Sequence, residues 1–212
     1  MSNFFENFKN QSFQDWQKKT ESEFTSQEYN NLYSEYEDIK ISPYYQHSNN
    51  NIVLNFPEEI KNLQLIDATN PKTANKKALN ALNAGIDGIS FSNPSNLKVL
   101  LKEIKTEYIK LDFINVNDAF IHELKNYDGL NKIVGGIQTS SETKFKKIKK
   151  IVFVEGKNIK QQIKNGLNAL TKYEDNIEFH FQIKSNFFFE IAKIRAFRIL
   201  YNTIARKNPY IS

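Results

Sequence analysis

The segment Ser185–Tyr201 reads SNFFFEIAKIRAFRILY and combines two local patterns. Its aromatic start favours an extended approach, and the remainder favours a helix in which charged residues stand among apolar ones. Directly before it, IEFHFQI (Ile177–Ile183) has the composition and alternation of a strand. The end of the chain therefore predicts a strand followed by a helix.

The same alternation of strand and helix extends back to Leu63. Five further strand-like segments are LQLID (63–67), IDGISF (86–91), YIKLDFI (108–114), KIVGGI (132–137) and KIVFVE (150–155). Helices are expected after the first, second, third and fifth of them, the first beginning at Asn70-Pro71 and ending at Gly85. Between KIVGGI and KIVFVE, polar and basic residues replace the expected helix.

Alternating strands and helices with short connections predict a parallel sheet with right-handed crossovers. The count is five or six strands, whereas a closed eight-stranded (β/α)8 barrel usually takes about 250 residues. Counting alone therefore allows a small open α/β sheet as well as part of a barrel.

Residues 1–60 read differently from residues 61–212, which we expect to form the α/β domain. Ser12 can cap a helix that carries Trp16 on one face, and Pro43 and Pro57 interrupt any longer helix. We therefore predict an N-terminal arm, part helical and part extended, in which Trp16, Tyr44 and Tyr45 contact a partner.

The composition excludes several classes of protein. The chain has 212 residues and no cysteine, so it can form neither a disulfide nor a thiolate metal site. No apolar run approaches the ~20 residues of a membrane span, and the net charge of +5 is modest for this length. The basic run Lys144–Lys150 favours a solvated turn over a phosphate-binding patch. We expect a cytoplasmic protein that binds neither nucleic acid nor a membrane.

The segment Ser185–Tyr201 resembles a phrase of the methylmalonyl-CoA mutases, adenosylcobalamin-dependent enzymes that interconvert methylmalonyl-CoA and succinyl-CoA. Weaker similarities occur in the expected order at Ser12–Phe24, Asp38–Gln46 and Leu65–Phe91, the last resembling the small, non-catalytic subunits. The resemblance implies an incomplete (β/α)8 TIM-barrel-like domain, with further barrel sequence expected beyond Ser212. The residues that carry the family signature are Asn186, Phe187, Phe188, Glu190, Lys193, Arg195 and Arg198.

The motifs for cofactor and substrate are missing. Mutases that hold the cofactor carry a D-x-H-x-x-G phrase, and none of His47, His122 and His180 stands in that context. Catalytic subunits also carry an RPW-type phrase before the second strand, and they present Arg and Ser where this chain has Asn176 and Glu178. An acidic Glu178 would repel the phosphates of CoA. The sequence therefore predicts no catalytic, cofactor-binding or metal-binding residue.

Several residues admit two interpretations. His180 is expected to be a hydrogen-bonded structural residue rather than a functional group facing a barrel lumen. The charged residues of the helix within Ser185–Tyr201, Glu190 with Lys193 among them, are expected to form ion pairs on the helix surface or to dock to a partner, rather than to act in catalysis. Phe187 and Phe188 are expected to pack in the core and at an interface, and Asp67 to assist helix capping.

The leading hypothesis is a small-subunit-like component of a heterodimeric methylmalonyl-CoA mutase of propionate metabolism. It would support a large catalytic subunit that alone holds adenosylcobalamin, and the isolated chain would be inactive. The alternative is a degenerate or split barrel fragment that acts as an interaction protein or has no function.

Overall fold

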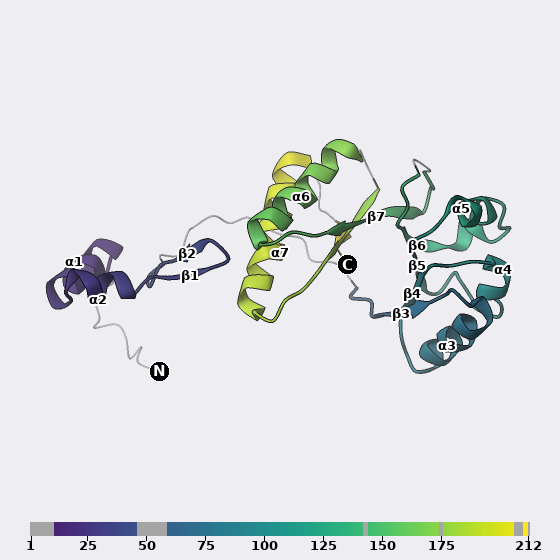
Figure 1. Ribbon diagram of the computed structural model, residues 1–212, viewed down its shortest axis with the longest axis horizontal. Helices are drawn as coiled ribbons and strands as arrows, with labels where there is room; N and C mark the ends of the chain where they lie inside the picture. The colour runs from purple at the N-terminus through teal and green to yellow at the C-terminus, as the bar shows by residue number, and fades with distance from the viewer. Residues whose placement is uncertain (1–10, 46–58, 142–143, 174–175, 206–209, 212) are drawn as a thin grey trace, which may run out of the picture. The chain divides into compact units, whose positions relative to one another are not determined.

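The computed structural model describes residues 11–45, 59–141, 144–173, 176–205 and 210–211. The chain divides after Val53 into two compact units (Figure 1). Among the described residues, no helix is both long enough and apolar enough to cross a membrane.

The first unit contains two helices and a two-stranded hairpin: α1 (Phe13–Glu23), α2 (Ser26–Asn31), β1 (Ser34–Tyr36) and β2 (Ile39–Ile41). Ser12 and Thr25 each form a capping box with the acidic residue three positions later. The sequence predicted the first helix but not the hairpin. Its turn residues, Glu37 and Asp38, both have positive φ, and the glycine that usually signals such a turn in a sequence is missing.

The second unit contains a parallel sheet whose strand order equals the chain order. Its described strands are β3 (Leu63–Asp67), β4 (Gly88–Ser92), β5 (Lys110–Ile114), β6 (Val134–Ile137), β7 (Ile148–Val154), β8 (Ile177–Phe181) and β9 (Tyr210–Ile211). The predicted parallel α/β architecture is confirmed, and β9, of two residues, was not predicted. Sequential order with right-handed crossovers places the helices on one face of such a sheet.

The connecting helices are α3 (Pro71–Asn83), α4 (Leu97–Leu100), α5 (Asp118–Lys125), the 3-10 turn η1 (Leu130–Lys132), α6 (Ile159–Lys172) and α7 (Phe187–Ala205). Asn70 caps α3, Pro71 is its first residue, and Gly85 follows it with φ of +95°, as predicted. The helix α4 is a single turn, because Asn96 and Glu103, on either side of it, have left-handed backbones. Between β6 and β7, the described residues 138–141 and 144–147 contain no helix.

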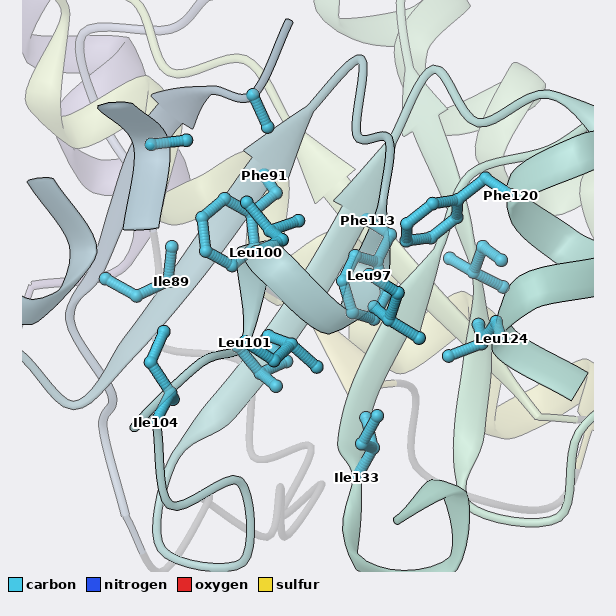
Figure 2. Packing of buried hydrophobic residues seen from close by; sticks show 14 of the residues in the cluster. Ile89, Phe91, Leu97, Leu100, Leu101, Ile104, Phe113, Phe120, Leu124 and Ile133 are labelled. Carbon is cyan, nitrogen blue, oxygen red and sulfur yellow. The ribbon is translucent and has the colours of Figure 1, made fainter. Parts of the chain in front are cut away.

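The buried side chains of this unit form two hydrophobic clusters. In the first cluster, Ile89, Phe91 and Phe113 of the sheet pack against Leu100 of α4 and Phe120 of α5 (Figure 2). Figure 1 shows α3, α4 and α5 beside strands β3–β6, and α6 and α7 beside β7.

The second cluster lies between β7, β8, α6 and α7. The ring of Phe197 on α7 lies 5.0 Å from that of Phe179 and 4.9 Å from that of Phe181. A Cβ atom on Gly166 would come within 2.7 Å of Phe197, so α6 and α7 pack closely there. The side chains on the opposite face of the sheet belong to neither cluster.

Candidate functional site

A row of polar positions crosses the face of the sheet that points away from the helices. Ser90 on β4 pairs with Asp112 on β5, which pairs with Gly136 on β6, and Gly136 pairs with Lys149 on β7. Side chains alternate between the two faces of a strand, and the neighbours of Ser90 and Asp112 are buried in the first hydrophobic cluster. The row therefore lies on the opposite face.

Titratable side chains from β5 and β8 meet on this face. Lys110, Asp112, Glu178 and His180 are here named the β5–β8 cluster. Nε2 of His180 donates to Oε1 of Glu178 at 3.0 Å and lies 3.9 Å from Oδ2 of Asp112. Lys110 Nζ donates to Glu178 and lies 3.4 Å from Oδ2 of Asp112. The side chain of Asp112 is fully buried, and that of Glu178 is 4% exposed.

These contacts require a strongly curled sheet. Strands β6 and β7 separate β5 from β8, so a flat sheet would hold β5 and β8 on the order of 14 Å apart. Gly136 makes room for the curl, because a Cβ atom there would lie 2.5 Å from Ile151 Cγ1 and 3.2 Å from Asp112 Oδ1. The β5–β8 cluster therefore occupies a concave face, as in a barrel-like sheet.

The two carboxylates have pKa values shifted in opposite directions. Burial acts to raise the pKa of Glu178, but the hydrogen bond from His180 and the charge of Lys110 outweigh burial and lower it from 4.5 to about 2. Burial raises the pKa of Asp112, and the charge of Glu178 adds to this effect, against Lys110, His180 and the amide of Gly136. Glu178 is therefore the more firmly ionised of the two carboxylates.

The concave face also contains polar atoms without a hydrogen-bond partner among the described residues. Oδ1 of Asp112 accepts from the amide of Gly136 at 2.8 Å, but its buried Oδ2 receives no hydrogen bond. The buried Oγ of Ser90, one strand away, also has no partner. Such atoms are costly unless a further donor, a water molecule or a cation satisfies them.

A hollow of about 560 Å³ lies elsewhere, at the amino-terminal ends of β3, β4 and β5. Its charged side chains are already engaged locally. Lys61 pairs with Glu59 at 3.4 Å, and Asp87 accepts from the amide of Asn62 at 2.8 Å. We therefore regard the β5–β8 cluster, and not this hollow, as the candidate site.

The helix α7 follows β8 directly and contains a buried ion pair between Glu190 and Lys193. Residues 153–209, from within β7 to beyond α7, match the family model of methylmalonyl-CoA mutase. This segment is related to the methylmalonyl-CoA mutase family.

The mutase match covers α6, β8 and α7 and leaves β3–β6 outside. The similarities to the mutases at Ser12–Phe24, Asp38–Gln46 and Leu65–Phe91 lie outside the match, and they stay predictions. A comparison with curated proteins finds no match.

The mutase signature residues have distinct environments on α7. The side chain of Asn186 accepts from the amide of Phe189 at 3.4 Å, at the start of the helix. Glu190 and Lys193 form the predicted pair, but its predicted place on the surface is wrong: the residues are 4% and 1% exposed. Lys193 is drawn inward because its Nζ donates to the backbone oxygen of Gln182 at 2.9 Å.

The exposed members of the mutase signature include two aromatic residues. Phe187 and Phe188 are 68% and 79% exposed, so their predicted place in the core is wrong. They precede the first buried position of α7, Glu190, and their rings contact each other edge to face. Arg195 is exposed and Arg198 half-buried. Contact of these residues with a partner stays a prediction.

The first unit contains the three residues of the N-terminal arm that the sequence predicts to contact a partner, namely Trp16, Tyr44 and Tyr45. Trp16 and Tyr44 stack with ring centroids 5.4 Å apart, so each covers part of the other. Tyr45 is 70% exposed, and its hydroxyl accepts from the amide of Ser42 at 2.9 Å. Their contact with a partner stays a prediction.

The histidines differ in their surroundings. His180 is hydrogen-bonded, as predicted, and it also lies on the concave face. His122 is exposed on α5 and contacts Asn126, whereas His47 lies outside the described residues. Asp67 accepts from the amide and hydroxyl of Thr69 in the turn that leads to α3, while Asn70 provides the helix cap.

Asp112 is the residue of this site that sequence reasoning missed. It lies between Leu111 and Phe113 in an apolar strand, and it forms a K-x-D pattern with Lys110. The strand β8 has the matching pattern E-x-H, Glu178 and His180. Charged residues two apart on a strand share one face of the sheet. Because charged side chains are rarely buried without a partner, these two patterns could have indicated a polar site on that face.

Proposed function

We propose that this chain is a small-subunit-like component of a methylmalonyl-CoA mutase. Its role is to support a large catalytic subunit, which alone holds adenosylcobalamin and the acyl-CoA substrate during the interconversion of methylmalonyl-CoA and succinyl-CoA. The observation that carries the proposal is the mutase match at residues 153–209, centred on α6, β8 and α7.

The electrostatics of the concave face support a non-catalytic role. Lys110 contacts the carboxylates of Asp112 and Glu178. Burial lowers the pKa of Lys149, and the charge of Lys110 lowers it further, whereas the charges of Glu178 and Asp112 act to raise it. CoA carries phosphates that favour uncommitted arginine or lysine side chains. Lys110 is therefore not available to bind those phosphates.

The outer surface of α7 supports a role in assembly. Apolar residues along this helix remain exposed: Phe187, Phe188, Ile191, Leu200 and Ile204. Phe187, Phe188 and Ile191 gather at the start of the helix, and exposed apolar side chains gathered in this way often mark an interface with another protein. Their position within the matched region agrees with contact between mutase subunits.

Co-expression with the large mutase subunit of the same organism, followed by size-exclusion chromatography and a mutase assay, tests the proposal. We expect the two chains to co-elute, and mutase activity to fall when this chain is omitted. A double variant, Phe187→Ser with Phe188→Ser, should weaken co-elution because both side chains are exposed. Thr203→Ala, a change at an exposed position of the same helix, is the matched control.

Separate elution of the wild-type chains, with mutase activity unaffected by omission, would contradict the proposal. That outcome would favour the alternative of a barrel fragment without a mutase role. Turnover of methylmalonyl-CoA by the isolated chain with added adenosylcobalamin would contradict the non-catalytic assignment.

A further inference from the structure

We propose that Asp112, Glu178 and His180 form a binding site for a divalent transition-metal ion of the zinc class, which bridges β5 and β8. The site differs from the proposed assembly role of α7. It can be tested on the isolated full-length chain without a partner or a mutase assay.

The geometry of the three side chains suits such an ion. One ligand atom from each lies within 4.8 Å of the others. Around a tetrahedral zinc ion, with bonds of about 2.0–2.2 Å, neighbouring ligand atoms lie about 3.4 Å apart. The distances from His180 Nε2 to Glu178 Oε1 and to Asp112 Oδ2, 3.0 and 3.9 Å, lie on either side of that value. Small rotations of the side chains would therefore bring the ligands into position.

A second observation separates this site from an ordinary group of acidic side chains. The side chain of Asp112 is fully buried, and its Oδ2 atom, which faces His180 and Lys110, receives no hydrogen bond from the described residues. The Oγ of Ser90, on the neighbouring strand, is buried and also has no partner. A metal ion would satisfy the carboxylate oxygen, and a water molecule bound to the ion could donate to the hydroxyl.

The donor types indicate which ions fit. An imidazole nitrogen with two carboxylates suits zinc, iron, cobalt or manganese, whereas calcium and magnesium prefer oxygen ligands alone. The ring of Phe153 stands edge to face against His180 with centroids 5.3 Å apart, which restricts the orientation of the imidazole. Binding through Nε2 places the ring proton on Nδ1, so the proton that Nε2 now donates to Glu178 must leave that nitrogen.

In the metal-free chain, Lys110 supplies the positive charge beside the two carboxylates. Its Nζ contacts both carboxylates, and its side chain is 15% exposed, so the ammonium group can reach solvent by rotating its aliphatic stem. A divalent ion between the same carboxylates would repel the ammonium group and displace it. The structure therefore predicts that Lys110 competes with the metal.

Titration of the chelator-treated full-length chain with zinc, against a chromophoric competing chelator, tests the proposal. We expect saturable binding of one zinc ion per chain, and visible absorption bands of tetrahedral cobalt when Co²⁺ replaces zinc. Asp112→Asn and His180→Ala should abolish both signals. Lys110→Met should tighten zinc binding by about tenfold or more, since it removes the competing charge.

His122→Ala is the matched control, because His122 is exposed on α5, and its zinc affinity should equal that of the wild type. Circular dichroism checks that each variant is folded, and the cobalt spectrum of the wild type provides a test that needs no variant. Absence of zinc binding by the wild type would overturn the proposal. So would binding that His180→Ala leaves intact, or several weak equivalents per chain without the cobalt bands.

Discussion

Glu178 is buried on the concave face, yet the hydrogen bond from His180 and the charge of Lys110 lower its pKa to about 2 against the effect of burial. Asp112 lies on the same face, and burial raises its pKa. The two carboxylates thus differ because both His180 and Lys110 contact Glu178 more closely than they contact Asp112. At the scale of single residues, the two carboxylates of the concave face therefore differ in how firmly they are ionised.

Glu178→Gln should destabilise the chain by about 3 kcal/mol at pH 7, since a pKa lowered from 4.5 to about 2 represents that stabilisation of the charged form. The stabilisation from Glu178 is complete above pH 4.5 and is lost as the pH falls toward about 2. The difference in unfolding free energy between the wild type and the variant should therefore shrink over this interval. Urea unfolding at a series of pH values measures it.

Glu155→Gln, at an exposed position, is the control and should change stability little at any pH. A difference between the wild type and Glu178→Gln that stays constant from pH 7 to pH 2 would contradict the pKa assignment. Asp112 acts with the opposite sign. Its raised pKa gives stability that is present at low pH and lost as the pH rises through the folded-state pKa.

Gly135→Ala should destabilise the chain by about 3 kcal/mol or more, because overpacking against backbone leaves little room for relaxation. A Cβ atom there would lie 1.8 Å from the backbone oxygen of Leu111, which cannot move without disturbing the pairing of β5 with β6. Gly85→Ala is the comparison: it has open space and a left-handed backbone, and should cost about 1 kcal/mol. Thermal unfolding of both variants checks the order, and equal losses would refute it.

At the scale of elements, α7 has two surfaces with different roles. Phe197 and Tyr201 contact the ring of Phe179 on β8, whereas Phe187 and Phe188 are exposed. The charged pair that the sequence suggests for the surface is inside. The helix therefore secures β8 from one side and leaves apolar surface on the other.

Phe197→Ala should cost about 3–5 kcal/mol of stability, as removal of a fully buried aromatic ring does. Phe188→Ala should change stability by no more than about 0.5 kcal/mol, because the side chain is 79% exposed. Urea unfolding of the two variants measures the contrast. A similar loss for both would show that Phe188 is covered in solution.

The elements that could be predicted from the sequence are those with local signals. The order Asn70-Pro71 and then Gly85 marked both ends of α3, and apolar alternation marked β8. The length of α4 could not be predicted, because Asn96 and Glu103 adopt left-handed backbones that their residue types do not specify. Local patterns therefore defined most strands and helices but not every boundary.

The candidate site depended on information that a single sequence hides. The patterns K-x-D and E-x-H lie 68 residues apart at Lys110 and Glu178. Only the curl of the sheet brings them together, and that curl depends on close packing at Gly136. The sequence singled out Glu178 and His180, but it gave Asp112 no partner.

At the scale of the second unit as a whole, its two hydrophobic clusters meet along a short seam. Strands β6 and β7 pair in register at Gly135–Ile148, Gly136–Lys149 and Ile137–Lys150. The first cluster takes its helices from α3–α5, and the second takes them from α6 and α7. Each cluster therefore has helices of its own, whereas β7 contributes Ile148 to the first cluster and Val154 to the second.

Hydrogen exchange should report this division, because local opening follows cooperative units. Phe197→Ala should lower amide protection in α6 and β8 more than in β4 and β5. Leu100→Ala, in the first cluster, should show the opposite pattern. Mass spectrometry of peptides from both variants measures it, and uniform loss of protection in both would show a single cooperative unit.

The pairing of β6 with β7 also determines how the chain would respond to proteolysis between these strands. Trypsin has sites between β6 and β7, because Lys144, Lys146 and Lys147 precede β7 and are exposed. The bond from Lys110 to Glu178 crosses from one side of that cut to the other. A nicked chain would thus retain an electrostatic link as well as paired strands, and its two fragments should remain associated until acid protonates Glu178.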